Sequence, residues 1–358
     1  MVADSGSLTG AINGGTGVDV LNLTSKSTAL DFRLATAPSI PGVLGGYVGV
    51  EQVQSNSVGG GKVTGSNAAT AWSISNTGQI VVGGVTYFGV GSIVAGTATD
   101  TLTGPALAAN WTVSGTNTGT LISSASTINF SGVENLTGSL FEDSIELFPE
   151  GRITGNINGG SGVGLNSLSY SQWSVGVLVD LSISTAGNAQ SINGITSLFQ
   201  LIIGGAGNDF LKGASNAGTI LVGLAGNDTL IGGMQRDLLF GGAGTDILNG
   251  SGGDDLLVSG VVAFETDRTS FYLIHGEWQS ARTFAQRTAN LAGNGTGVRA
   301  NGNIFLNSNV ADSVADTVFA DSDSDVLTGG LNQDWFFSSL SEITDFVGTG
   351  TVPDRRDG

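Results

Sequence analysis

The chain has 358 residues, which suffices for one large domain or for two to three smaller ones. Gly accounts for 59 residues and the net charge is −18, so the chain lacks the basic surface that nucleic-acid binding requires, and a divalent cation suits it better as a partner. The absence of Cys excludes disulfides and thiolate metal sites, and no stretch approaches the roughly 18 apolar residues of a transmembrane segment.

Residues 1–200 are expected to form a β-repeat region rich in Gly, Thr and Ser. Short segments alternate apolar and polar residues between Gly, Asn, Ser and Thr turns, which is typical of β-strands. The segment LTGAINGGTGV (8–18) recurs as ITGNINGGSGV (153–163). Such recurrence indicates that this region is built from repeated structural units.

The tryptophans of this region allow two interpretations. Trp72 and Trp111 stand 39 residues apart in two similar segments, residues 71–96 and 110–138. Together with Trp173 they could stack on sugars, as in a carbohydrate-binding β-solenoid. The recurrence favours the other interpretation, in which the first two are core residues of a repeat.

The densest repeat spans residues 204–258. Aligned in units of nine, it reads GGAGNDFLK, GASNAGTILV (one residue longer), GLAGNDTLI, GGMQRDLLF, GGAGTDILN and GSGGDDLLV. Five units carry Asp at the sixth position, namely Asp209, Asp228, Asp237, Asp246 and Asp255. The last four are nine residues apart, with glycines before most of them and Leu two positions after each. Repetition at a fixed period predicts a stacked coil, which we place at residues 201–262.

Residues 263–300 interrupt this pattern. Apolar residues recur at helical spacing in two runs, 271–278 and 281–292. Ser280 is the expected N-cap of the second run, and Gly293 is its expected stop. We predict a short helical insert whose apolar stripe packs against the end of the coil.

Residues 301–358 are expected to contain degenerate copies of the repeat and a C-terminal segment. Asp316, Asp325 and Asp334 are again nine apart, and GGLNQDWFF matches the unit well. A single copy, GGTGVDVLN, lies far upstream and keeps its carboxylate at Asp19. For these acidic residues a role in solubility competes more strongly with a role in metal binding.

A glycine-rich turn that ends in Asp suits a hard cation. Glycine permits backbone conformations closed to other residues, so a six-residue turn can present carbonyl oxygens without bulk. Calcium takes six to eight oxygen ligands at about 2.3–2.6 Å, and the Asp adds one formal charge. The last three residues of each unit form a short strand with its central side chain in the core. The predicted core residues are Leu211, Leu230, Leu239, Leu248 and Leu257.

Two units make one turn of the coil, so residues eighteen apart stack at the ~4.8 Å strand spacing. Asp228 then lies over Asp246, and Asp237 over Asp255. Stacked carboxylates repel one another unless a cation lies between them, so we predict Ca²⁺ as the cofactor. The alternative is a glycine-rich solenoid that binds no metal. The predicted metal-site residues are Gly205, Gly207, Asp209, Gly226, Asp228, Gly233, Asp237, Gly242, Gly244, Asp246, Gly253, Asp255, Asp325 and Asp334.

The units GGAGNDFLK, GLAGNDTLI and GGAGTDILN resemble those of RTX proteins, the hemolysin-type calcium-binding repeat family. The resemblance covers residues 204–258 and, more loosely, 311–347. It implies a parallel β-roll with calcium in its turns and export from the cell, as in the C-terminal part of a large repetitive bacterial surface or secreted protein. Two departures stand out: the unit 213–222 lacks the Asp, and Arg236 brings a positive charge near an ion. We expect about three good sites in the main block, by the charge that calcium needs.

The residue types of common catalytic sites are scarce. His275 is the only histidine, so no HExxH zinc motif exists, and no G-x-S-x-G elbow occurs. Glu134, Glu142, Glu146 and Glu150 offer carboxylates for glycoside hydrolysis, but nothing in the sequence pairs any two of them. We expect a protein that is not an enzyme, with His275 in a surface or packing role.

These observations favour a calcium-binding structural protein outside the cell. The affinities of extracellular calcium modules, ~10⁻⁴–10⁻³ M, match a role in which folding is linked to calcium binding after export. We expect part of a secreted adhesin or matrix protein, with a cell-surface or matrix polymer as partner. Two alternatives stay open: the non-catalytic C-terminal tail of a secreted hydrolase, and the carbohydrate-binding solenoid. The first residues show no cleavable signal peptide, so we expect either export by a C-terminal signal or the tail of a longer protein.

Overall fold

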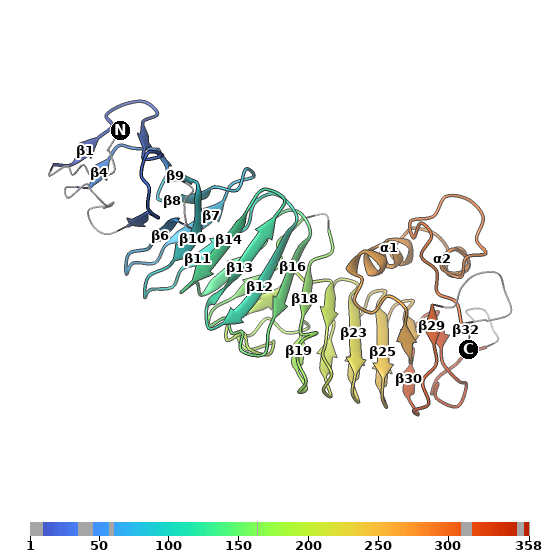
Figure 1. Ribbon diagram of the computed structural model, residues 1–358. Coiled ribbons are helices and arrows are strands. Elements are labelled where there is room, and N and C mark those ends of the chain that lie inside the picture. Colours follow the sequence, from blue (N-terminus) through green and yellow to red (C-terminus); the bar gives the residue numbers. More distant parts are fainter. Residues whose placement is uncertain are drawn as a thin grey trace. The chain divides into compact units, whose positions relative to one another are not determined.

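The computed structural model describes residues 10–34, 46–56, 61–162, 164–308, 317–348 and 354–357. Their regular structure consists of short strands and two helices, which confirms the prediction of an all-β protein with a helical insert (Figure 1). The chain divides into two compact units. The first unit comprises residues 1–166 and 191–198, and the second comprises 167–190 and 199–358.

The first unit contains two large sets of paired strands. One set, in spatial order, is β3 (Asp31–Arg33), β6 (Gly61–Thr64), β10 (Val90–Val94), β14 (Thr127–Ser131), β13 (Thr118–Ser123), β12 (Ala109–Gly115) and β16 (Asp143–Leu147). The other is β2 (Val20–Asn22), β5 (Gln52–Gln54), β9 (Val85–Phe88), β8 (Ile80–Val82), β7 (Ala71–Ile74), β11 (Thr101–Thr103), β15 (Asn135–Thr137), β17 (Ile157–Asn158) and β20 (Thr196–Ser197). A separate parallel pair joins β1 (Ile12–Asn13) and β4 (Tyr47–Val48).

The first unit twice departs from parallel pairing. In β7–β8–β9 and in β12–β13–β14 the chain forms a three-stranded antiparallel excursion. These excursions contain Trp72 and Trp111, so the recurrence in the sequence corresponds to a recurring structure, although the two lie in different sheets. Both indoles are 1% exposed, and Trp173 in the second unit is 6% exposed. None presents a free ring face to a sugar, which confirms the core interpretation.

The second unit is a parallel coil. One sheet contains β18 (Ser167–Ser169), β21 (Leu201–Ile203), β23 (Ile220–Ala225), β25 (Leu238–Ala243), β27 (Leu256–Val258), β31 (Trp335–Phe337) and β32 (Arg355–Asp357). The other contains β19 (Leu178–Asp180), β22 (Phe210–Lys212), β24 (Thr229–Ile231), β26 (Ile247–Asn249) and β30 (Val326–Thr328). Leu230 pairs with Leu248, eighteen residues on, and Leu239 with Leu257. The five Leu residues predicted for the core are all fully buried, so the predicted parallel β-roll is confirmed.

The two sheets of the roll differ in what covers their outer faces. Strands β22, β24, β26 and β30 bury only their central residue fully, as expected for a sheet with one face in solvent. In β21, β27 and β31 all three residues are buried. The sequence carries this difference, because LII, LLF, LLV and WFF are continuous apolar runs whereas FLK, TLI and ILN are not.

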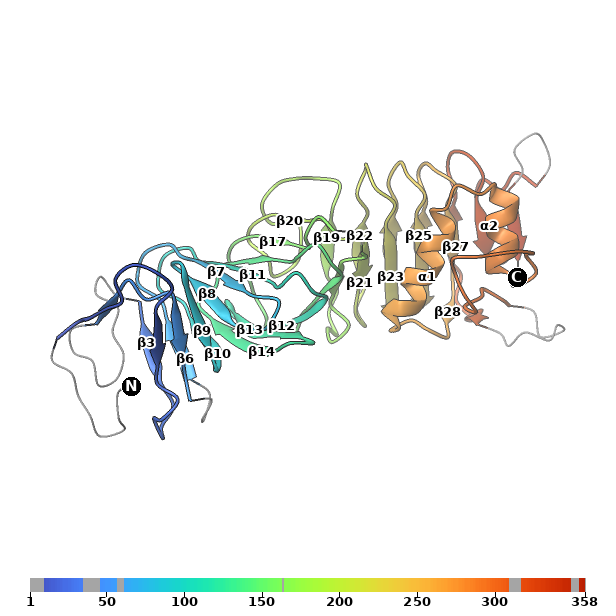
Figure 2. The same ribbon diagram turned by 90° about the horizontal axis from the view of Figure 1, so that it is seen from above.

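The helical insert packs on this sheet at β25 and β31 (Figure 2). It contains α1 (Arg268–Trp278) and α2 (Phe284–Leu291), and the antiparallel pair β28 (Val261–Val262) and β29 (Val318–Phe319) flanks it. Phe271 of α1 lies 5.1 Å from Phe240, and Trp278 lies 6.1 Å from Trp335, between ring centroids. Burying one such side chain contributes about 1.5–3 kcal/mol, so these contacts fix the insert on the sheet.

The start of α2 differs from the prediction. Its N-cap is Thr283, whose side chain accepts the N–H of Gln286 in a capping box, and the predicted cap Ser280 lies in the preceding turn. Thr283 has the advantage because Gln286 returns a hydrogen bond to the backbone N–H of the cap. Gly293 follows the helix with φ +85, so the predicted stop is confirmed. In the described part of the chain, no helix is long and apolar enough to cross a membrane.

Candidate metal centre

The sixth-position Asp residues form a continuous hydrogen-bonded ladder along one side of the roll, which we call the first side. The N–H of Val177 donates to Oδ1 of Asp209 (2.7 Å), and the N–H of Asp209 donates to Oδ1 of Asp228 (2.7 Å). The N–H of Asp228 donates to Oδ1 of Asp246, and that of Asp246 to Oδ1 of Asp325 (both 2.8 Å). Each carboxylate thereby fixes the backbone of the preceding coil through a charge-assisted hydrogen bond.

The second side of the roll has a ladder of the same kind, built from the units that alternate with those of the first side. The N–H of Thr219 donates to Oδ1 of Asp237 (2.6 Å), and that of Asp237 to Oδ1 of Asp255 (2.8 Å). The ladder continues from Asp255 to Asp334 (2.8 Å) and from Asp334 to Asp354 (3.0 Å). The predicted stacking of Asp228 with Asp246 and of Asp237 with Asp255 is confirmed.

The second carboxylate oxygen separates these residues into two groups. Oδ2 of Asp209 accepts the N–H of Gly205 (2.7 Å), and Oδ2 of Asp237 accepts that of Gly233 (2.5 Å). Three other Oδ2 atoms are buried and have no hydrogen-bond partner among the described residues. They belong to Asp228, Asp246 and Asp255. A buried carboxylate oxygen without a partner is costly, so these three positions call for a further ligand.

Each of these oxygens packs directly against the glycine at the first position of its unit. A Cβ placed on Gly223 would lie 2.1 Å from Oδ2 of Asp228 and 2.5 Å from the carbonyl oxygen of Gly241. Any side chain there would collide with both oxygens. The glycines in the same situation are Gly204, Gly232, Gly241 and Gly250, each facing an Asp Oδ2 and a carbonyl oxygen of the next coil.

Later glycines of the turn are needed for close stacking of neighbouring loops. Gly226, Gly242, Gly244 and Gly253 have φ between +108 and +125, where side chains are disfavoured. A Cβ on Gly244 would lie 2.2 Å from the carbonyl oxygen of Gly226. The loops therefore present backbone oxygens to one another at a spacing that only glycine permits.

Burial leaves the ladder carboxylates poorly stabilised by protein alone. Burial, with the charge of Asp209, raises the pKa of Asp228 to about 7. Burial, with the charges of Asp228, Asp325 and Asp321, raises the pKa of Asp246 to about 8.

The second side shows the same effect. Burial raises the pKa of Asp237 to about 7 and, with the charges of Asp237, Asp334 and Asp254, raises the pKa of Asp255 to about 10. Burial also raises the pKa of Asp334 to about 8, and on the first side that of Asp325 to about 6. A bound cation would reverse these shifts, because it stabilises the ionised form.

These donors fit calcium. They are oxygens only: carboxylate oxygens that carry charge, and carbonyl oxygens of the adjoining turns, which is the ligand set of a hard cation. Within the described ranges, no group of three or more His, Cys, Asp or Glu side chains converges on one point. Asp228, Asp246 and Asp255, with the loops around them, are the residues that would hold the ion, and the ion would neutralise the stacked carboxylates.

The acidic residues of the degenerate repeat copies lie in three different situations. Asp325 and Asp334 occupy full ladder positions, and Asp316 lies outside the described residues. Oδ2 of Asp19, in the first unit, is also buried without a described partner, and its N–H donates to the carboxylate of Glu51 (2.8 Å). The metal-binding role of Asp325 and Asp334 stays a prediction.

Arg236 corrects one expectation. Its Nη1 donates to the carbonyl oxygen of Ser280 (2.9 Å) in the insert, and its Nε lies 3.8 Å from Oδ2 of Asp254. The positive charge is thus paired and directed to the insert rather than to the ladder. In the unit without Asp, Thr219 takes the place, and its Oγ1 accepts the N–H of Ala214 (3.1 Å) in place of a carboxylate.

The first-position glycines pack against the carboxylates, a role that the sequence prediction did not assign. The predicted site residues include only glycines of the second and fourth positions. The signal was present in the double glycine that opens GGAGND, GGMQRD and GGAGTD. The second glycine serves the turn, and the first lets the carboxylate approach the backbone closely.

Two of the residues considered for catalysis can be described in the structure. His275 lies in α1, where burial lowers its pKa to about 4 and its Nε2 has no partner among the described residues. Glu134 accepts the N–H of Asp100 (2.8 Å) and the side-chain amide of Asn117 (2.9 Å). Glu134 thus supports the backbone of the neighbouring coil, and the absence of a catalytic role stays a prediction.

Comparison with known families identifies the repeat. Four segments match the RTX calcium-binding nonapeptide repeat, at residues 201–220, 214–248, 222–257 and 311–340. This match confirms, over these segments, the resemblance seen in the sequence. No curated protein matches the chain.

Proposed function

We propose that this chain is a calcium-dependent structural module of a secreted adhesin or matrix protein, and that it has no catalytic role. The observation that carries the proposal is the set of three buried Oδ2 atoms, of Asp228, Asp246 and Asp255, that lack a partner in the described structure. Without a cation, their desolvation opposes folding of the coil. With calcium bound, binding free energy contributes directly to folding free energy.

The proposed location outside the cell follows from this linkage. A module of ~10⁻⁴–10⁻³ M affinity is filled only where calcium is near millimolar, as it is outside cells. The chain would therefore stay loose during export and become rigid on arrival. A rigid roll suits attachment to a cell-surface or matrix polymer, the class of partner that we propose.

A titration of the full chain tests the proposal. The chain is freed of metal with a chelator and desalted, and far-UV circular dichroism is followed as calcium or magnesium is added. We expect a large gain of β signal at about millimolar calcium and little at equal magnesium, because magnesium demands compact octahedral coordination and keeps its water. A metal-free chain that keeps its spectrum and melting temperature, with no ion detected by elemental analysis, would contradict the proposal.

A further inference from the structure

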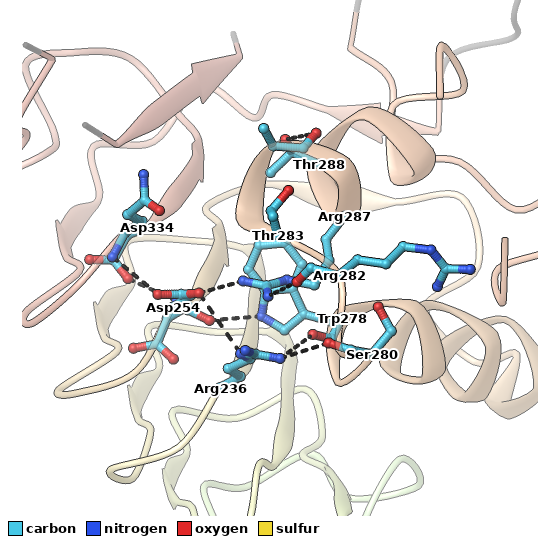
Figure 3. Close-up of polar contacts among 12 residues, drawn as sticks. Arg236, Asp254, Trp278, Ser280, Arg282, Thr283, Arg287, Thr288 and Asp334 are labelled. Atoms are coloured by element: carbon cyan, nitrogen blue, oxygen red, sulfur yellow. Dashed lines mark hydrogen bonds and ion pairs between the residues drawn. The ribbon is translucent and has the colours of Figure 1, made fainter. Parts of the chain in front are cut away.

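The insert contacts the roll at the calcium loops of the second side, in addition to its apolar packing on the sheet. Figure 3 shows Asp254 between Arg236 and Arg287. Arg287 of α2 donates through Nη2 to Oδ2 of Asp254, and the Nε of Arg236 lies 3.8 Å from the same oxygen. The N–H of Gln333 donates to Oδ1 (3.3 Å). Arg236 and Asp254 occupy the fifth position of their units, directly before the ladder residues.

The turn between α1 and α2 binds the backbone of the same two loops. The indole N–H of Trp278 donates to the carbonyl oxygen of Asp254 (2.9 Å), and Nε2 of Gln279 donates to that of Arg236 (2.6 Å). In return, Nη1 of Arg236 donates to the carbonyl oxygen of Ser280 (2.9 Å). These acceptors stand in the right places only when loops 232–237 and 250–255 have their stacked conformation.

Arg287 makes the docking dependent on that conformation. Its side chain is 1% exposed, and its guanidinium lies over the rings of Trp278 and Phe284, at 5.1 and 5.9 Å from their centroids. Its Nη1 donates to the carbonyl oxygen of Arg282 (2.9 Å). A buried guanidinium needs a carboxylate, and Asp254 supplies it from the roll. If loop 250–255 loosens, the docked insert retains a buried cation without its partner, which disfavours docking.

We propose that the helical insert is an intramolecular ligand of the second-side loops, which docks on them in their calcium-bound conformation and thereby raises their affinity for calcium. This inference rests on the proposed function, because it assumes that calcium orders loops 232–237 and 250–255. The coupling is reciprocal by thermodynamic linkage: if calcium favours docking by some factor, docking favours calcium binding by the same factor. Docking also keeps the charge of Arg236 paired with Asp254 and directed to the insert.

Hydrogen exchange of the full chain, followed by mass spectrometry across a calcium titration, tests the coupling. The test variant is Arg287→Met, which removes the cation but keeps an unbranched side chain against Trp278. The matched control is Arg299→Met, which removes the same charge from the same insert. The guanidinium of Arg299 lies 4.7 Å from the ring centroid of Phe305.

In the unaltered chain, we expect amides of residues 268–291 to gain protection together with loops 232–237 and 250–255 as calcium is added. In Arg287→Met, the calcium midpoint of these loops should rise by about tenfold, a usual size for coupling between sites, and the insert should lose protection at low calcium. Loops 204–209 and 223–228 of the first side should shift less. The Arg299→Met control should leave every midpoint near that of the unaltered chain.

The outcomes separate the two proposals. If calcium protects no loop within 204–258, the proposed function fails, and this inference fails with it. If calcium protects the loops while the insert is equally protected with and without calcium, only the coupling is wrong. The coupling is also overturned if Arg287→Met and Arg299→Met give the same midpoints. If the insert of Arg287→Met fails to dock even at saturating calcium, the calcium midpoint of loops 232–237 and 250–255 still tests the coupling. A raised midpoint supports it, and an unchanged midpoint overturns it.

Discussion

Residues 96–166 of the first unit and 204–258 of the second use the same polar ladder but complete it differently. In the first unit, Oδ1 of Asp100 accepts the N–H of Thr70 (2.8 Å) and Oδ2 accepts that of Gly96 (3.0 Å). Oδ1 of Asp143 accepts the indole N–H of Trp111 (3.1 Å), and Oδ2 accepts the N–H of Ser139 (2.6 Å). Every oxygen of these two carboxylates has a protein donor.

The second unit lacks such donors at Asp228, Asp246 and Asp255. The comparison shows that the ladder itself does not require a metal. At Asp228, Asp246 and Asp255 the second carboxylate oxygen has no donor in the described structure, and there an ion would complete the coil. A single N–H donor beside the carboxylate therefore separates a repeat that is paired by protein alone from one with an unpartnered carboxylate oxygen.

Calcium removal should have the largest effect, and it should affect the second unit but not the first. In a chelator, we expect amides of β21, β23, β25 and β27 to lose hydrogen-exchange protection, because Oδ2 of Asp228, Asp246 and Asp255 then lies buried without a partner in the loops of this coil. Amides of β10, β12, β14 and β16 should keep theirs. Equal loss in both units, or none in either, would contradict the assignment of different partners to the two ladders.

Acid should restore part of what calcium removal takes away. The folded-state pKa values of Asp228 and Asp237 are raised to about 7 and that of Asp255 to about 10, against an ordinary value of 3.8. A carboxyl group with a raised folded-state pKa binds its proton more tightly in the folded chain. It therefore stabilises the fold fully below pH 3.8, and this stabilisation is lost as the pH rises through about 7 to 10. The desalted, calcium-free chain should therefore gain β signal between pH 8 and pH 5, as measured by circular dichroism. A flat profile would show that the carboxylates do not limit folding.

Adding a methyl group against one carboxylate should lower the stability of the roll by a smaller amount, and only in the neighbouring coils. The substitution Gly223→Ala places a Cβ 2.1 Å from Oδ2 of Asp228 and 2.5 Å from the carbonyl oxygen of Gly241. We expect a loss of about 1–3 kcal/mol in the calcium-bound state, measured by urea unfolding. The control is Gly91→Ala in β10, whose nearest neighbour would be the carbonyl oxygen of Thr127 at 3.7 Å, an ordinary contact. Equal losses in the two variants would indicate a backbone effect of alanine rather than a blocked site.

Neutralising one carboxylate in each unit sharpens the contrast further. Asp246→Asn should raise the calcium midpoint by about tenfold, equivalent to about 1.4 kcal/mol, because one charge of the site is removed. The same change at Asp143 directs an amide at the N–H of Ser139 or the indole of Trp111, and should cost about 1–3 kcal/mol whether or not calcium is present. Calorimetric unfolding with and without calcium distinguishes the two. A calcium-dependent loss at Asp143 would remove the distinction between the ladders.

Much of this architecture follows from the sequence because the period of nine is strict. It places Asp228 over Asp246 and Leu230 over Leu248, and the structure has these pairs in register. The docking of the insert did not follow, because Asp254 and Arg287 lie 33 residues apart and nothing local to either indicates the other. The cap of α2 was misplaced for the opposite reason: Ser280 and Thr283 are both good caps, and only the side chain of Gln286 decides between them.

One feature of the roll bears on how such proteins diversify. The ladder contact from Asp246 to Asp325 spans 79 residues where its neighbour from Asp228 to Asp246 spans 18, yet both hydrogen bonds measure 2.8 Å. The spacing between coils is therefore the same before and after the inserted segment. The turn after β27 therefore accommodates a long insertion whose two ends return to adjacent coils, and the strand register is the same on both sides of it.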